Sequence, residues 1–200
     1  MAKRILQTKI CILGDSAVGK TSLIRRFVFD LFDDRYIATM GTKVSKKKLS
    51  LSIEKKEGLE PKWARDNEVS EMIDKRIDVE LTLLIWDIVG QEEYHELREL
   101  YYKGASGALV VCDVTREKTI ENTVEWVNSF YDTVGKKPVL FVANKYDLVK
   151  DKLDIEIEKL IEKLSFGKQI YTSAKTGENV ELAFSTLSKM VLSDVDRKEY

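Results

Sequence analysis

One stretch limits what this chain can fold into more than any other: Gly14-Asp15-Ser16-Ala17-Val18-Gly19-Lys20-Thr21 fits the phosphate-cradling pattern G-x-x-x-x-G-K-[ST]. Apolar residues 10–13 before it predict a buried strand, and residues 22–27 after it predict a helix, which is the context the pattern requires. The glycines let successive N–H groups face an anion beside the positive end of that helix. A nucleotide site is therefore predicted. The alternative is a glycine-containing turn with an exposed lysine.

Two side chains of this phosphate loop (residues 14–21) are suited to nucleotide chemistry. Lys20 is expected to supply a point charge to the β- and γ-phosphates, and Thr21 a hydroxyl to Mg²⁺. The nucleotide-binding residues predicted here are Gly14, Asp15, Ser16, Ala17, Val18, Gly19, Lys20, Thr21 and Ser22.

Composition narrows the class of protein. A chain of 200 residues with 44% hydrophobic and 34% charged residues is typical of one globular domain. Its 33 basic residues nearly cancel its 34 acidic ones, so no overall field favours nucleic acid. Cys11 and Cys112 lie in apolar runs, which indicates buried thiols of a reducing compartment rather than a disulfide.

No targeting signal or membrane span is predicted. The first apolar run is too short for the core of a signal peptide, and no later run is long enough to cross a bilayer. Residues 193–200 contain no cysteine, so no prenylation signal is expected. We expect a cytoplasmic monomer without an intrinsic membrane anchor, recruited to membranes only peripherally if at all.

Apolar runs alternate with helix-period segments almost throughout, which predicts an α/β fold: a mostly parallel sheet with helices on both faces. The pattern predicts six strands, at residues 10–13, 42–53, 79–86, 107–112, 139–143 and 169–171. Polar and apolar residues alternate over 42–53, which indicates an edge strand. Helices are predicted over 120–134, 153–164 and 180–191, the last with Thr176 as N-cap.

The base is indicated by Asn144-Lys145-Tyr146-Asp147, which follows a predicted strand where ligands of an open α/β sheet bind. The Asp147 carboxylate can accept hydrogen bonds from the N1–H and the exocyclic amine of guanine, whereas adenine lacks that amine. A buried acceptor left unpaired by the wrong base discriminates by factors of about 10⁴. Guanine is therefore predicted, and a polar turn after a strand is the alternative.

Together, GDSAVGKT and NKYD resemble the Ras superfamily of small GTPases. Asp87-Ile88-Val89-Gly90-Gln91 matches the family's D-x-x-G-Q pattern, Ser173-Ala174-Lys175 matches its guanine loop, and the four motifs occur in family order. Residues 36–41 and 101–105 look most like the Rab branch. The resemblance implies a P-loop NTPase G domain spanning residues 1–200.

Carried over by resemblance, Thr21 and Thr39 would ligate Mg²⁺, Asp87 would complete the metal site by holding a metal-bound water, and Gly90 would donate its amide to the γ-phosphate. Gln91 would orient the attacking water and act with Lys20 as a catalytic residue. Phe32 would pack on guanine, although one of Phe27, Phe29 and Phe32 could equally belong to the core. The remaining nucleotide contacts implied are Asn144, Lys145, Asp147, Ser173, Ala174 and Lys175.

The implied function is a molecular switch of signalling and vesicle traffic that binds GTP or GDP with Mg²⁺ and hydrolyses GTP slowly. Thr39 and Gly90 hold their loops only while a γ-phosphate is present, so exchange factors, activating proteins and effectors are expected at these switches. Arg35 is expected to be a solvated or partner-binding charge, and His95 to have no catalytic role. A GTP-binding scaffold without useful hydrolysis and an ATP-using kinase or ATPase are the alternatives.

Two departures from the family pattern stand out. Val89 occupies a position that is usually alanine, which puts the hydrolysis and exchange rates in doubt. Thr39 and Asp87 lie 48 positions apart, about twice the family's separation, which indicates an insertion at about residues 54–78. We interpret it either as an elongated hairpin or as a partner-binding appendage with Trp63 and an apolar helix face formed by Val69, Met72, Ile73 and Ile77.

Overall fold

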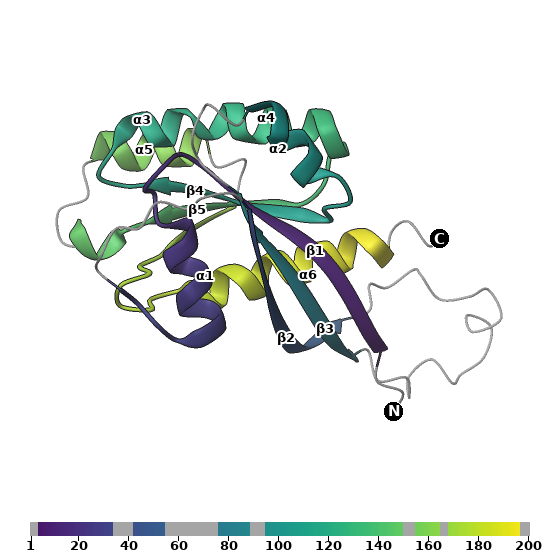
Figure 1. The fold of residues 1–200 in the computed structure, drawn as a ribbon. Helices are drawn as coiled ribbons and strands as arrows, with labels where there is room; N and C mark the ends of the chain where they lie inside the picture. The colour runs from purple at the N-terminus through teal and green to yellow at the C-terminus, as the bar shows by residue number, and fades with distance from the viewer. Residues whose placement is uncertain are drawn as a thin grey trace, which may run out of the picture.

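The computed structural model describes residues 4–33, 42–54, 76–88, 95–149, 155–164 and 168–196, and these carry every structural statement below. Within them the strands form one sheet of six, in the order β2-β3-β1-β4-β5-β6 (Figure 1). The strands are β1 (Arg4–Leu13), β2 (Lys43–Glu54), β3 (Arg76–Asp87), β4 (Gly107–Asp113), β5 (Val139–Asn144) and β6 (Gln169–Tyr171). Only the edge strand β2 runs antiparallel to its neighbour. The predicted six-stranded, mostly parallel sheet is confirmed.

Helices cover both faces of this sheet, as predicted. The helices are α1 (Lys20–Phe29), α2 (His95–Tyr102), α3 (Glu117–Glu121), α4 (Thr123–Val134), α5 (Ile155–Leu164) and α6 (Val180–Asp196), with a 3₁₀ turn, η4 (Tyr146–Leu148). Helices α1 and α6 lie on one face, and α2 to α5 lie on the other (Figure 1). None of the helices in the described ranges is long and apolar enough to cross a membrane.

The central strands are buried on both faces, which explains their continuous apolar sequences. In β1, Ile10 and Ile12 pack in the core on the side of α1 and α6, whereas Cys11 and Leu13 pack on the side of α4. The α1–α6 side is closed by Phe27 stacked on Phe184, with ring centroids 3.9 Å apart. Successive side chains along each strand therefore pack alternately into two filled cores. This packing holds the carboxyl ends of the strands in fixed positions.

The structure corrects two details of the predicted helices. The helix expected over 120–134 is divided at Asn122, whose side chain donates to Asp15 of the phosphate loop instead of facing solvent. Thr176 is not the N-cap of α6, because its hydroxyl accepts from the Glu178 N–H and the helix begins only at Val180. Both side chains therefore form hydrogen bonds in the loops at the edge of the sheet.

Strands β2 and β3 form a long hairpin that reaches into the predicted insertion. Glu54 pairs with Arg76 and Ile53 with Ile77, so the ends of the range 54–78 are strand. The interpretation of Ile77 as part of a helix face is therefore wrong. Trp63, Val69, Met72 and Ile73 lie outside the described residues, as does the rest of that proposed appendage.

Candidate functional site

Polar residues gather where the parallel strands end. The phosphate loop follows β1, Asp87 ends β3, Asn144 ends β5, and Ser173 comes two residues after β6. The carboxyl ends of parallel strands share one edge of the sheet, and ligands of such sheets bind there. Asn144 and the phosphate loop, 126 positions apart in the sequence, are thereby brought into hydrogen-bonding contact.

The glycines of the phosphate loop are required by space as well as by backbone angle. Gly14 has a φ of +133°, and a Cβ there would lie 2.1 Å from the Val111 carbonyl oxygen. Gly19 has a φ of +99°, and a Cβ there would lie 2.3 Å from Nδ2 of Asn144. The loop is therefore packed directly against β4 and against the end of β5, where any larger residue would displace it.

Lys20 begins α1 and is buried inside the loop. Its Nζ donates to the carbonyl oxygens of Gly14 and Asp15, each at 2.7 Å. Only 7% of the residue is exposed, so the ammonium group lies in a region of low dielectric. A cation held there beside a helix N-terminus is suited to binding polyphosphate.

Asp87 and Thr21 form a second polar cluster at the same edge. The Thr21 hydroxyl donates to Oδ2 of Asp87 at 2.5 Å, while the buried Oδ1 finds no hydrogen-bond partner among the described residues. Burial raises the pKa of Asp87, and the Thr21 hydrogen bond and the charges of Lys20 and Lys43 oppose that shift. A carboxylate oxygen that is buried without a partner, next to a hydroxyl, fits the oxygen ligation that Mg²⁺ requires.

Asn144 joins the phosphate loop to the opposite end of the site. Its Nδ2 donates to the Val18 carbonyl at 2.8 Å. Its Oδ1 accepts from the Thr172 hydroxyl at 3.1 Å and from the Ala174 N–H at 3.2 Å. Since Asn144 is fully buried, its role in this structure is to fix the distance between two loops.

The residues expected to recognise the base lie together. Asp147 accepts from the Ser173 hydroxyl at 2.6 Å, and Ser173 in turn accepts from the Thr176 N–H at 3.0 Å. Lys145, in the left-handed conformation at φ 64°, extends toward β4 and pairs with Asp113. The base loop (Ser173–Lys175) and the turn after β5 are thus one hydrogen-bonded unit.

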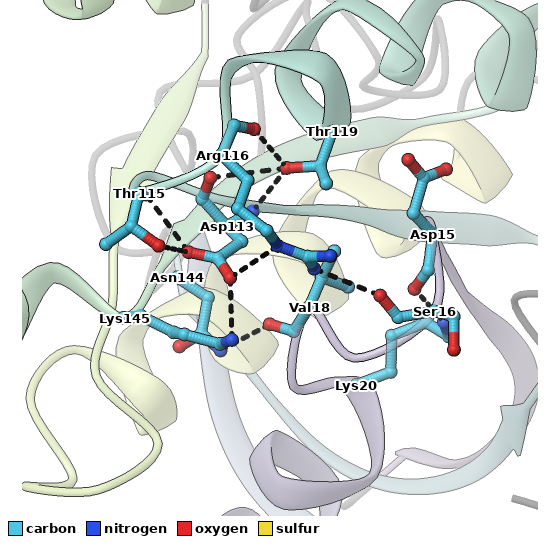
Figure 2. A network of polar contacts seen from close by, with 10 residues as sticks. All are labelled: Asp15, Ser16, Val18, Lys20, Asp113, Thr115, Arg116, Thr119, Asn144 and Lys145. Atoms are coloured by element: carbon cyan, nitrogen blue, oxygen red, sulfur yellow. Dashed lines mark hydrogen bonds and ion pairs between the residues drawn. The ribbon is translucent and has the colours of Figure 1, made fainter. Parts of the chain in front are cut away.

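Asp113, which is not among the predicted site residues, lies at the end of β4 and is the hub of the network in Figure 2. Its Oδ1 accepts from the backbone N–H and the hydroxyl of Thr115, while its Oδ2 accepts from Lys145 at 2.6 Å and from Arg116 Nε at 2.9 Å. Burial tends to raise the pKa of Asp113, but the hydrogen bonds from Lys145 and Thr115 outweigh it, and the pKa is lowered. A signal was present: Asp113 comes at the end of an apolar run in the sequence, as Asn144 does.

The carboxylate of Asp15 was predicted only as part of the phosphate loop, yet it anchors that loop to α4. Its Oδ1 accepts from the Trp126 indole N–H at 2.7 Å, and its Oδ2 accepts from Asn122 Nδ2 at 2.9 Å. Trp126 also packs in the core with Val127 and Phe130, and the sequence gives no sign of its polar contact.

Arg26, also missed, connects α1 to the base loop. Its Nε donates to the Ala174 carbonyl at 3.0 Å and its Nη2 to the Lys175 carbonyl at 2.7 Å. The guanidinium group thereby binds two successive carbonyl groups of the base loop and links that loop to α1.

We expect Arg26→Ala to accelerate release of a bound guanine nucleotide about tenfold, because two charge-assisted hydrogen bonds that order the base loop are lost. The release rate of a fluorescent GDP analogue measures this. Arg25→Ala, which removes the same charge from the same helix, is the control and should leave the rate near that of the unmodified protein. Equal acceleration by both variants would show that charge, not loop positioning, is responsible.

The remaining predicted site residues either lie against the core or fall outside the described residues. Phe32 is partly buried against the core, with Arg26 6.0 Å from its ring centroid, while Phe29 is exposed and Phe27 is core. Stacking of Phe32 on a base thus stays a prediction. Thr39, Gly90 and Gln91 lie outside the described residues, as do Arg35 and Val89.

Comparison with known proteins gives matches along nearly the whole chain. The model of the Ras family matches residues 62–193, and that of Roc (Ras of Complex, a domain of DAPkinase) matches residues 9–62. Ras-related protein Rab-21 of Geodia cydonium is 32% identical over 94% of this chain and 72% of its own length. Human Ras-related protein Rab-8B is 31% identical over 95% of this chain and 81% of its own length. Mouse Rab-21 is 32% identical over 96% and 76%, respectively.

Proposed function

Because the chain belongs to the Ras superfamily of small GTPases, as a Rab-like guanine-nucleotide switch that hydrolyses GTP, we propose that the polar edge of its sheet is the nucleotide site. The observation that carries this proposal is the set of hydrogen bonds by which Asn144 joins the phosphate loop to the base loop. The arrangement keeps a phosphate-binding and a base-binding element at a fixed separation.

At the phosphate end, we assign anion binding to the N–H groups of residues 14–22 and to the Lys20 ammonium. When bound, Mg²⁺ would neutralise charge on the phosphate oxygens. Thr21 and Asp87 would hold it, together with Thr39. The buried, unpartnered Oδ1 of Asp87 supports that assignment.

At the base end, Asp147 would accept hydrogen bonds from guanine, and Lys145 and the base loop would complete the pocket. The short Asp147–Ser173 hydrogen bond supports this, because it fixes one carboxylate oxygen and leaves the carboxylate oriented. Phe32 would pack on the base from the segment that follows α1.

For hydrolysis, Gln91 would orient the attacking water and Lys20 would stabilise charge on the β–γ bridge, a mechanism of positioning without a covalent intermediate. Gly90 and Thr39 would hold the two switch loops only while the γ-phosphate is present. We propose slow turnover that an external activating protein accelerates. Val89 is the best support for the scaffold alternative, and nothing in the described residues favours that alternative.

We further propose that residues 1–200 form a single G domain that acts as a monomer, with an insertion between β2 and β3. Exchange factors, activating proteins and effectors would bind at the switches. Cys11 and Cys112 are buried free thiols, and burial raises the pKa of Cys11 to about 12. Two cysteines that remain free rather than forming a disulfide support a reducing, cytoplasmic location, and the Rab relatives support peripheral recruitment to membranes.

Single-turnover release of phosphate from GTP-loaded protein tests the assigned roles. We expect release that depends on Mg²⁺ and falls at least about tenfold in Gln91→Leu, since the attacking water loses its orienting group. His95→Ala, at the first residue of the helix that follows, is the control and should retain the rate. Phosphate release at the unmodified rate from Gln91→Leu would exclude the proposed role of Gln91.

A further inference from the structure

Arg116 contacts the phosphate loop although it lies 100 positions away in the sequence. Its Nη2 donates to the Ser16 carbonyl oxygen at 3.0 Å, while its Nε donates to Oδ2 of Asp113 at 2.9 Å (Figure 2). Two nitrogens of one planar guanidinium therefore bridge the end of β4 and the loop after β1. Lysine, with a single nitrogen, lacks this fork.

Asp113 makes Arg116 a rigid support. The carboxylate is 1% exposed, and both of its oxygens are used: Oδ1 by Thr115, and Oδ2 by Lys145 and Arg116. Because Asp113 is fixed on a buried central strand, the guanidinium group bound to it has a defined position.

The orientation of the Ser16 carbonyl determines the direction of the next N–H group in the phosphate loop. No described peptide bond is cis, so the N–H of Ala17 points opposite to the Ser16 carbonyl. Ala17 also has a φ of +61°, a conformation that an alanine rarely adopts and that the surrounding contacts must maintain. A donor that pins the Ser16 carbonyl on the outside of the loop turns the Ala17 N–H toward its inside, where phosphate is expected.

We propose that Arg116 is a positioning residue for phosphate binding: anchored by Asp113, it orients the Ser16–Ala17 peptide so that the Ala17 N–H faces the nucleotide. This inference rests on the nucleotide site proposed above. The β4–α3 turn would then help to retain the nucleotide. Arg116 would act through the geometry of its two hydrogen bonds and not merely through its positive charge.

Release of a fluorescent GDP analogue from Arg116→Ala tests the proposal. We expect release about tenfold faster than from the unmodified protein, and Arg116→Lys should stay within about threefold of Arg116→Ala. Lys118→Ala is the matched control, since its ammonium is exposed and pairs with Glu121. Its release rate should be unchanged.

Chemical rescue separates positioning from folding. The Arg116 side chain is 43% exposed, so a small cation can enter the space that Arg116→Ala leaves. Ethylguanidinium at millimolar concentration should slow release again, whereas ethylammonium at equal ionic strength should not. Unchanged release from Arg116→Ala, or equal rescue by ethylammonium or by Arg116→Lys, would overturn the proposal. Failure of the unmodified protein to retain any guanine nucleotide would instead reject the proposed site itself.

Discussion

Replacing Asp147 with alanine should weaken GDP binding by about 10³- to 10⁴-fold, because two guanine donors lose a charged acceptor. The effect on folding should be small, since the substitution removes only one acceptor from the Ser173 hydroxyl, for a cost of about 1 kcal/mol. Calorimetric titration with GDP measures the first effect, and thermal unfolding of the nucleotide-free protein measures the second.

A base analogue shows whether Asp147 is the acceptor. IDP keeps the N1–H of GDP but lacks the exocyclic amine, so the unmodified protein should bind IDP more weakly than GDP. That preference should disappear in Asp147→Ala, whereas Asp132→Ala, at an exposed site on α4, should retain it. A GDP preference that persists in Asp147→Ala would show that another group reads the amine.

The positions of several candidate site residues in the fold could be predicted from sequence. The phosphate loop, Asp87, Asn144 and Asp147 lie at or just after the end of a buried strand, and the periodicity that locates the strands also places these residues at one edge of the sheet. The same reasoning correctly places β2 at the edge, because alternation of polar and apolar residues reflects burial on one face only.

The supporting contacts could not be predicted in the same way. Arg26, Arg116 and Trp126 make contacts across the fold: Arg26 and Trp126 lie in helices, and Arg116 lies in the turn between β4 and α3. Trp126 is the clearest case: its ring completes an apolar core, while one nitrogen at its edge binds Asp15. Periodicity indicates the face of a side chain but not which single polar atom on it finds a partner.

Gly14 should be the least replaceable residue of the phosphate loop. In Gly14→Ala the new Cβ would meet the Val111 carbonyl oxygen at 2.1 Å, and that oxygen belongs to the backbone of a fully buried strand. The contact is relieved only if the loop or β4 moves, and the φ of +133° adds strain of its own. We expect a loss of more than about 3 kcal/mol in the free energy of unfolding.

Gly104→Ala is the matched control, because it separates backbone angle from space. Gly104 also has a positive φ, +75°, but no atom lies within 4 Å of the position its Cβ would take. Gly104→Ala should therefore lower the free energy of unfolding by only about 1 kcal/mol, which is the cost of the positive φ alone. Denaturant unfolding of the two variants measures the difference. Equal losses would mean that the phosphate loop moves freely away from β4, in which case the fixed separation between phosphate and base elements would not hold.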